Sequence, residues 1–397
     1  LRRRDFTHKD YQRSARIEKV VSTFVFDPWV TPNKPSNIIS TYQRSVHPCY
    51  VLKDEVSFYC LTEDEAWFVE APEGVEVWKS CYSPFHKIAQ LNYAVNVIRM
   101  PLESLYQLTE EMELNGEKVI VVDFLPRSGS TLFLQLFEET GQCVTYSECH
   151  YFNNSGHVVY PDDEERLRAV MKMYCKPRTT PTAAYVFKTV LVGSNLSPTL
   201  HRVLPEAKFV YIYRNAVPNA KSIDRISKSI PSARLLELIC GIHPKIFWYL
   251  KRKQYEILKL PFTEKEFAIA SKTKHLTEIM CYNWWLKSQW LYLERQKTGP
   301  PAPSLKYEDL INDPVKYTSA VFKYCGLSLD LLPKALTAIH KDSQRGSRLA
   351  RENFATEGGL SVFEDENFLA IARELGAEIG FNVTEDFHLS NDILSWV

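Results

Sequence analysis

A short polar segment between two apolar stretches contains the residue types of an anion-binding loop. Its sequence is PRSGST, and its candidate ligands are Arg127, Ser128, Gly129, Ser130 and Thr131. Backbone N–H groups at a helix start bind anions, a glycine lets a ligand approach the backbone, and hydroxyl and guanidinium groups add donors. The Walker pattern is absent, because no lysine follows Gly129. From this segment alone, an anion site and an ordinary helix N-cap both stay open.

Charged residues also follow three later apolar runs. Glu148 and His150 come after the first run, Lys188 ends the second, and Arg214 ends the third, with Ser222 eight positions further on. A carboxylate there could act as a general base, and the cations could bind phosphate. Taken singly, each has a structural alternative: a solvated glutamate, a lysine that reaches the surface, an arginine that caps a sheet. Together with Arg127, four strand ends carry Arg, Glu, Lys and Arg, and this coincidence favours a binding site.

The elements that would position these residues alternate between strands and helices. Strands are predicted at 119–125, 143–148, 183–189, 208–214 and 303–310, and helices at 131–140, 162–174, 197–204 and 217–227. This alternation predicts an α/β fold with three αβα layers and a roughly five-stranded parallel sheet, as in P-loop nucleotide kinases. Ligands of such sheets bind beyond the carboxyl ends of the strands, which is where the candidate residues fall.

The amino-terminal part of the chain has a different pattern. Short strands are predicted at 47–53, 56–62, 66–71 and 75–80, followed by a helical stretch at 83–112. We therefore predict two parts, a small β-rich region with a helical connector at 1–115 and a catalytic domain at 116–397. A late aromatic stretch has Trp284, Trp285 and Trp290, whose spacing favours core packing over an acceptor pocket.

Composition excludes several classes of function. The 397 residues carry a formal net charge of zero, which argues against nucleic acid as an obligatory partner. No apolar run is long enough to span a membrane. Nine cysteines without a C-x-x-C pair, and no H-E-x-x-H, leave a disulfide framework and a metal site unsupported.

The ordered set of motifs resembles sulfotransferases that use 3'-phosphoadenosine-5'-phosphosulfate (PAPS). LPRSGSTLFLQLFEE is similar to the loop that binds the 5'-phosphosulfate, in the arginine-type version of Golgi carbohydrate sulfotransferases. PEAKFVYIYRNAVPNAKSIDR is similar to the 3'-phosphate motif, and SLKYEDLINDP to a late strand and helix of the family. The resemblance covers roughly residues 118–330.

The resemblance implies roles for individual residues. The loop from Arg127 to Thr131 would hold the 5'-phosphosulfate, and Arg214 and Ser222 the 3'-phosphate. SECHYF is similar to a heparan-type segment with a catalytic glutamate, which makes Glu148 the base and His150 a possible assistant. Lys188 matches a lysine that precedes a threonine in cytosolic and heparan-type members of the family. A late QRGS segment, which contains Arg345 and Gly346, loosely matches a segment that binds the 3'-phosphate in cytosolic members.

The implied reaction is sulfuryl transfer from PAPS without a metal ion, to a hydroxyl or amine of a small-molecule or glycan acceptor that the sequence does not specify. Glu148 would take the acceptor proton, while Arg127 and Lys188 stabilise the leaving phosphate. Cytosolic members have a catalytic histidine where this chain has Val190, so the base role falls to Glu148.

Two alternatives stay open: a P-loop kinase of a small metabolite, and a nucleotide-binding module without activity. The kinase would require a loop lysine and an acidic strand end for Mg²⁺, which are not in the expected places. For the compartment, the arginine-type loop indicates Golgi relatives. The missing signal core and a sequon at Asn153, close to the expected base, favour the cytoplasm.

Overall fold

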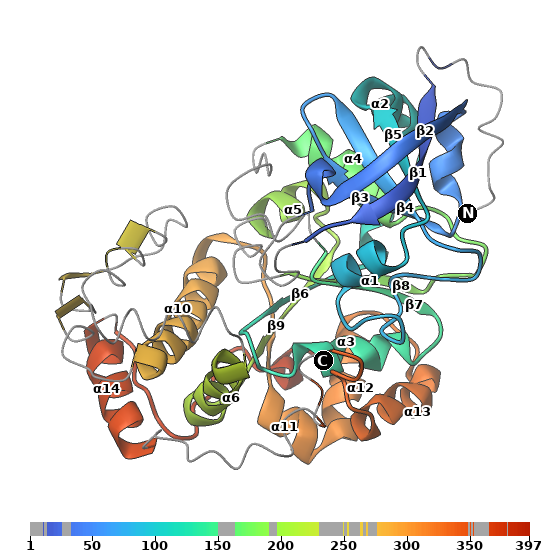
Figure 1. Cartoon of the computed structure of the whole chain (residues 1–397). Coiled ribbons are helices and arrows are strands. Elements are labelled where there is room, and N and C mark those ends of the chain that lie inside the picture. Colours follow the sequence, from blue (N-terminus) through green and yellow to red (C-terminus); the bar gives the residue numbers. More distant parts are fainter. Residues whose placement is uncertain are drawn as a thin grey trace. The chain divides into compact units, whose positions relative to one another are not determined.

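A computed structural model describes residues 11, 14–25, 33–149, 163–189, 197–229, 249, 252–253, 263–264, 267–268, 276–347, 350, 352, 365–378 and 380–397. Figure 1 shows its helices and strands. The chain forms two compact units. The first unit contains Leu1–Val121, Thr131–Lys208 and Cys325–Arg348, and the second unit contains Val122–Ser130, Phe209–Tyr324 and Leu349–Val397. The division into 1–115 and 116–397 stays a prediction.

An antiparallel sheet in the first unit confirms the β-rich amino-terminal region. Its strands are β1 (Ala15–Thr23), β2 (Ile38–Val46), β3 (Val56–Leu61), β4 (Glu65–Glu70) and β5 (Asn96–Pro101). Their order is β2-β1-β5-β4-β3, with antiparallel neighbours throughout (Figure 1). Aromatic and β-branched residues such as Phe58, Phe68 and Ile98 fill its buried side, as strand propensity requires.

One helical prediction in this region is wrong. The stretch 83–112 contains α1 (His86–Asn92), then strand β5, then α2 (Leu102–Glu110). Short apolar runs fit both the helical and the strand period. The pairing of β5 with β1 on one side and β4 on the other decides for the strand, because its backbone groups find partners along both edges.

Two predicted strands are also absent. Residues 47–53 form the 3-10 helix Pro48–Leu52, in which His47 Nδ1 accepts a hydrogen bond from the backbone N of Cys49 at 3.2 Å. Proline suits the first position of such a turn and removes a donor that a strand needs. Residues 75–80 form turns rather than a strand.

The predicted parallel sheet is confirmed. Its strands are β6 (Val119–Phe124), β7 (Cys143–Ser147), β8 (Ala184–Lys188), β9 (Lys208–Tyr213) and β10 (Ser304–Lys306). Their order is β10-β9-β6-β8-β7, and the sequence order therefore reverses on the two sides of β6. Nearly all of their residues are buried, which is typical of strands covered by helices on both faces.

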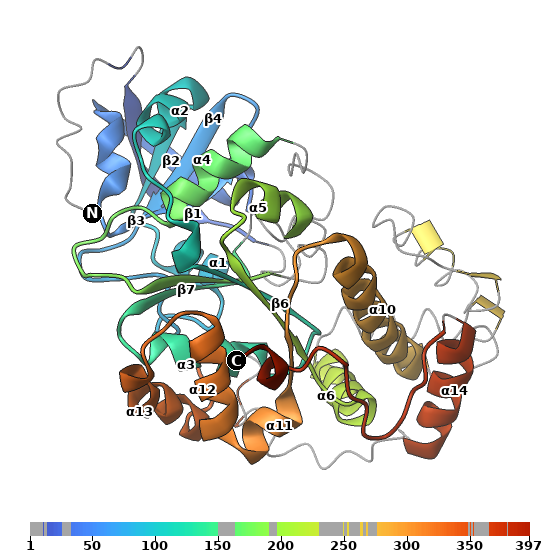
Figure 2. The same cartoon turned by 180° about the vertical axis from the view of Figure 1, so that it is seen from behind.

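Four helices are present where the sequence predicts them: α3 (Ser130–Glu138), α4 (Glu164–Tyr174), α5 (Ser197–Val203) and α6 (Ala216–Ser229). The predicted strand at 303–310 is wrong beyond Lys306, because the next residues form the helix α11 (Tyr307–Asn312). The other helices are α10 (Leu276–Thr298), α12 (Pro314–Tyr324), α13 (Leu332–Ala335) and α14 (Asp365–Glu378). Further 3-10 helices are Pro35–Asn37, Gly116–Lys118, Leu329–Leu331, Leu336–His340 and Ile393–Trp396. In the second unit, α6, α10 and α14 pack against one another (Figure 2).

Local sequence explains individual helices. The side chain of Asp163 caps α4 by accepting a hydrogen bond from Arg166 N at 3.0 Å. In α10, Trp285 is fully buried, as its spacing predicts, whereas Trp284 and Trp290 are half-buried. No helix among the described residues combines the length and the apolar character that a membrane span requires.

A buried histidine gives the first unit an acid-sensitive core. His86 lies against the rings of Tyr146 and Tyr174, with centroids 5.3 and 6.4 Å away. Neither ring nitrogen has a hydrogen-bond partner among the described residues. Burial, together with the positive charge of Arg178, lowers the pKa of His86 to about 3.

We expect the free energy of unfolding to fall as the pH drops from about 6.5 towards 3, by up to ~1.4 kcal/mol per pH unit from this residue. The reason is that the unfolded chain binds a proton that the folded state excludes. His86→Phe should flatten the slope in urea titrations at a series of pH values. Replacement of the exposed His340 by Gln is the matched control. Equal slopes in wild type and His86→Phe would contradict the prediction.

Candidate active site

The segment predicted to bind an anion forms a tight turn between β6 and α3. Ser128 N donates a hydrogen bond to Leu125 O at 3.1 Å, which closes the turn. Arg127 (φ 66°) and Gly129 (φ 80°) have left-handed backbone conformations. Left-handed residues in such turns create concave arrangements of N–H groups that bind anions. Because α3 begins at Ser130, the free N–H groups of its first turn belong to the same loop.

Gly129 is in close contact with Tyr307, the first residue of α11. A Cβ atom on Gly129 would lie 2.2 Å from Cδ2 and 2.4 Å from Cε2 of the tyrosine ring. The same ring lies 4.8 Å from the guanidinium carbon of Arg214. Tyr307 was not among the predicted site residues. Its place directly after β10 is the signal that could have found it, since the same rule selected Arg214 at the end of β9.

Three predicted anion ligands from distant parts of the sequence meet in the second unit. Arg127 Nε donates to Ser222 Oγ on α6 at 3.1 Å. Arg214 Nη1 donates to the backbone oxygen of Arg127 at 3.4 Å. Asn219, also on α6, donates to Pro126 O at 2.7 Å. The loop, the end of β9 and the start of α6 are therefore joined by direct hydrogen bonds.

The guanidinium group of Arg214 has an N–H donor that could bind an anion. Its Nε lies 3.6 Å from Glu308 Oε1, beyond hydrogen-bond distance, and has no hydrogen-bond partner among the described residues. Glu308 instead accepts from Asn215 N, at 3.3 Å to each carboxylate oxygen. The backbone of Arg214 is fixed by Trp285, whose Nε1 donates to Arg214 O at 2.8 Å. A fixed backbone with an unsatisfied guanidinium edge is the arrangement expected of a ligand-binding arginine.

A second unsatisfied group lies in the loop itself. Ser128 is completely buried, and its Oγ has no hydrogen-bond partner in the described part of the chain. Leaving a buried hydroxyl unpaired costs about 1–3 kcal/mol, so such groups call for an explanation. Each of the two groups, Ser128 Oγ and Arg214 Nε, could donate to an anionic ligand.

The first unit contains a second cluster, made by the ends of β7 and β8 and the first turn of α3. Lys188 is buried, and its Nζ donates to Glu148 Oε1 at 2.8 Å and to Thr131 Oγ1 at 3.1 Å. The side chain of Glu148 is 19% exposed, so the carboxylate is not sealed off from solvent. The backbone N of Glu148 donates to Lys188 O at 3.2 Å, which extends the strand pairing by one residue. Glu148, Lys188 and Thr131, all predicted site residues, are thus in contact.

Backbone strain coincides with the predicted site. Arg127 (φ 66°) and Glu148 (φ 53°) are the two non-glycine residues with left-handed conformations among the described positions. Such residues cost of order 1–3 kcal/mol and cluster at functional sites. This supports a functional role for both.

The remaining predicted site residues are His150, Arg345 and Gly346. His150 lies outside the described residues, as does Val190. Arg345 and Gly346 lie in a turn of the first unit, where Arg345 N donates to Asp342 O at 3.1 Å and both residues are exposed. Their assignment to the 3'-phosphate stays a prediction.

One polar cluster at a strand end was missed. Buried Lys306, the last residue of β10, contacts Asp386 and lies 3.1 Å from His388 Nε2. The hydrogen bond from Lys306 lowers the pKa of Asp386 to about 2. Asn215 Nδ2 donates to Asp386 Oδ1 at 3.5 Å. Among the described residues, no group of three or more histidine, cysteine and acidic side chains could hold a metal ion.

Comparison with known proteins gives structural neighbours but no family. No family model matches the chain, and no curated protein matches its sequence. A sulfotransferase domain from the curacin biosynthetic pathway shares 12% identity at a TM-score of 0.36, covering 67% of this chain and 98% of that one. A sulfotransferase from Alicyclobacillus acidocaldarius shares 16% identity at a TM-score of 0.33, covering 57% of this chain and 96% of that one.

A mouse sulfotransferase complexed with PAP shares 13% identity at a TM-score of 0.33, covering 68% of this chain and 75% of that one. These solved structures are sulfotransferases. The identities and TM-scores are too low for the likeness to establish what this chain does.

Proposed function

We propose that the chain is a sulfotransferase that moves a sulfuryl group from PAPS to a hydroxyl or amine of a small-molecule or glycan acceptor. The observation that carries the proposal is the meeting of Arg127, Arg214 and Ser222 around a loop with unsatisfied donors. Adenosine 3',5'-bisphosphate has two phosphate groups, and we assign one of them to the loop and the other to Arg214 and Ser222.

The loop would bind the 5'-phosphosulfate through its backbone N–H groups and through the hydroxyls of Ser128, Ser130 and Thr131. Arg214 and Ser222 would bind the 3'-phosphate, with Arg214 turning from Glu308 towards the stronger phosphate acceptor. Arg127 Nε donates to Ser222 Oγ, so a 3'-phosphate bound by Ser222 would compete with Arg127 for that hydroxyl. Arg127 stays protonated, so it stabilises charge and gives up no proton.

The chemical step breaks the bond between sulfur and the bridging oxygen and forms a bond between sulfur and the acceptor atom. The electron pair stays with the leaving phosphate, which becomes 3',5'-ADP, and the acceptor proton moves to Glu148. Lys188 Nζ donates to Glu148 Oε1 at 2.8 Å and so fixes one oxygen of the proposed base. Lys188 would also stabilise the charge that develops on the leaving phosphate.

The test is binding of 3',5'-ADP, 5'-AMP and ATP, measured by thermal unfolding without added metal. We expect 3',5'-ADP to raise Tm by about 3–5 °C at 100 times its Kd, and the other two to do much less. Arg214→Met should weaken 3',5'-ADP about 10- to 100-fold, because a charge-assisted hydrogen bond is lost. Lys297→Met, which removes an exposed cation of α10 paired with Glu294, is the matched control.

The outcomes separate the three functions. Stabilisation by ATP that requires Mg²⁺ would contradict the sulfotransferase and favour a small-molecule kinase. Stabilisation by 3',5'-ADP without turnover of PAPS on any acceptor would favour a nucleotide-binding module. No response to any nucleotide would remove the basis of the proposal.

A further inference from the structure

Arg178 is a buried cation in the loop between α4 and β8. Its side chain is only 6% exposed, and Glu76 Oε1 lies 3.9 Å from its Nη1, which is too long for a hydrogen bond. Nε and Nη1 have no hydrogen-bond partner among the described residues, whereas Nη2 donates to the phenol oxygen of Tyr146 at 3.1 Å. Burying a guanidinium without a close counter-ion costs several kcal/mol. Such a cost is typically retained where a residue has a role beyond packing.

Tyr146, which binds Arg178, is held by hydrogen bonds at its hydroxyl and by stacking of its ring. Its hydroxyl accepts from Arg178 and donates to Tyr174 O at 2.8 Å, so both directions of hydrogen bonding are used. Its ring stacks on Phe187 of β8 with a centroid distance of 5.1 Å and an interplanar angle of 19°. The ring of Tyr146 is therefore fixed at its tip and along its face.

The fixed ring lies next to the charged cluster along the same strand pair. Tyr146 is paired with Phe187 in the register of β7 and β8, and the next pair is Ser147 with Lys188. Glu148 follows directly, with its backbone N bonded to Lys188 O at 3.2 Å. One strand residue advances the chain by only about 3.3 Å, so a displacement of Tyr146 is passed to Glu148 within two residues.

The backbone conformation of Glu148 depends on contacts with the residues around it. Its left-handed conformation (φ 53°) is unfavourable for a side-chain-bearing residue and persists only where the surroundings fix it. The hydrogen bond from Lys188 fixes its side chain. The ring of Tyr146, two residues earlier in the chain, fixes the end of β7.

We propose that Arg178 is a positioning residue, which fixes the end of β7 through Tyr146 and so keeps Glu148 in its left-handed conformation against Lys188. The assignment of Glu148 as base rests on the proposed function. The positioning itself does not.

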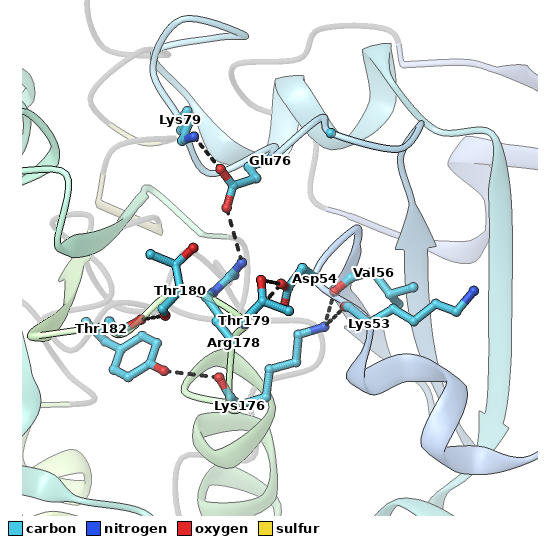
Figure 3. Close-up of polar contacts among 12 residues, drawn as sticks. Lys53, Asp54, Val56, Glu76, Lys79, Lys176, Arg178, Thr179, Thr180 and Thr182 are labelled. Atoms are coloured by element: carbon cyan, nitrogen blue, oxygen red, sulfur yellow. Dashed lines mark hydrogen bonds and ion pairs between the residues drawn. The ribbon is translucent and has the colours of Figure 1, made fainter. Parts of the chain in front are cut away.

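The amino-terminal region supplies the surroundings of Arg178. Glu76 faces Arg178 and is itself paired with Lys79 (Figure 3). Next to Arg178 in the sequence, Thr179 N donates to Asp54 Oδ2 at 3.1 Å. These contacts give the amino-terminal region, to which the sequence assigns no chemistry, a part in positioning the base.

The same loop has a second anchor. Lys176 is buried, and its Nζ donates to Val51 O at 2.8 Å. It also donates to Val56 O at 2.5 Å and to Lys53 O (Figure 3). These three hydrogen bonds to backbone oxygens fix the loop at a second point.

The experiment uses the full chain and compares Arg178→Met and Tyr146→Phe with wild type. Tyr146→Phe keeps the stacked ring and removes only the hydroxyl, so it serves if Arg178→Met does not fold. Lys172→Met is the matched control. It removes a cation of α4 that donates to a backbone oxygen of α2, Thr109 O at 2.7 Å.

Two readouts are combined. For turnover of PAPS, we expect kcat to fall about 10-fold or more, since a displacement of about 1 Å at a reacting group can cost 10²-fold. The KM for PAPS and the Kd of 3',5'-ADP should stay within about two-fold, because the donor ligands are elsewhere. Hydrogen exchange at the Glu148 amide should become faster in both variants and stay unchanged in Lys172→Met.

A fall in kcat that matches only a loss of folded protein, with the same loss in Lys172→Met, would overturn the proposal, as would unchanged kcat and unchanged exchange. If wild type does not bind 3',5'-ADP, the proposed function fails. The exchange measurement then decides the positioning by itself. Faster exchange at Glu148 supports it, and unchanged exchange overturns it.

Discussion

Glu148→Gln is expected to lower kcat for PAPS turnover about 10²- to 10⁴-fold, the usual contribution of a general base. The amide has nearly the shape of the carboxylate and can still accept a hydrogen bond from Lys188, so the contact at 2.8 Å survives without its charge. What is lost is the ability to take the acceptor proton. The affinity for 3',5'-ADP should change little, because its proposed ligands do not include this side chain.

The measurement is release of 3',5'-ADP from PAPS in the presence of a panel of phenol, alcohol, amine and glycan acceptors. Glu117→Gln is the control. It neutralises an exposed carboxylate of the same unit for which no catalytic or binding role is predicted. Turnover by Glu148→Gln at a rate close to wild type would remove Glu148 as the base. It would leave the donor site untouched.

Gly129→Ala is expected to abolish donor binding, with a loss of affinity for 3',5'-ADP of 100-fold or more, equivalent to about 3 kcal/mol. Two effects add. A left-handed backbone costs an alanine about 1–2 kcal/mol, and the new methyl group would meet the Tyr307 ring at 2.2 Å. Either the loop or the tyrosine must move, and the ring of Tyr307 also contacts Arg214.

Gly141→Ala is a matched control, because Gly141 is also left-handed (φ 70°) and nothing lies within 4 Å of an added Cβ atom. It should carry the conformational cost alone and lower the free energy of unfolding by about 1–2 kcal/mol with unchanged nucleotide affinity. Isothermal titration with 3',5'-ADP and thermal unfolding separate the two effects. Normal affinity in Gly129→Ala would contradict the assignment of this loop as a ligand site.

The parallel sheet could be predicted because its signal is local. Each of its strands is an apolar run bounded by polar turns, and the expected segments at 119–125 and 208–214 differ from β6 and β9 by one residue at their ends. Strand β5 could not be separated from a helix, because its apolar residues fit both periods and only pairing with two neighbours decides. Strands β1 and β2 were not predicted for a different reason. Many of their residues are exposed, so apolar and polar residues do not alternate regularly along them.

For the site, the sequence by itself determined which residue types stand at the strand ends: Arg127 and Gly129 in the loop, Glu148, Lys188 and Arg214 after later runs. The rule that parallel strands bring their carboxyl ends to one edge was enough to select them.

Only the tertiary structure decided how they are used. Arg127 and Ser222 are 95 residues apart in the chain, and no local pattern predicts their hydrogen bond. The pairing of Lys188 with Glu148, the contact of Tyr307 with Gly129 and the burial of Arg178 beside Tyr146 depend on packing between distant segments. Sequence patterns report what a residue prefers locally, whereas these contacts are set by which surfaces the whole chain can bury together.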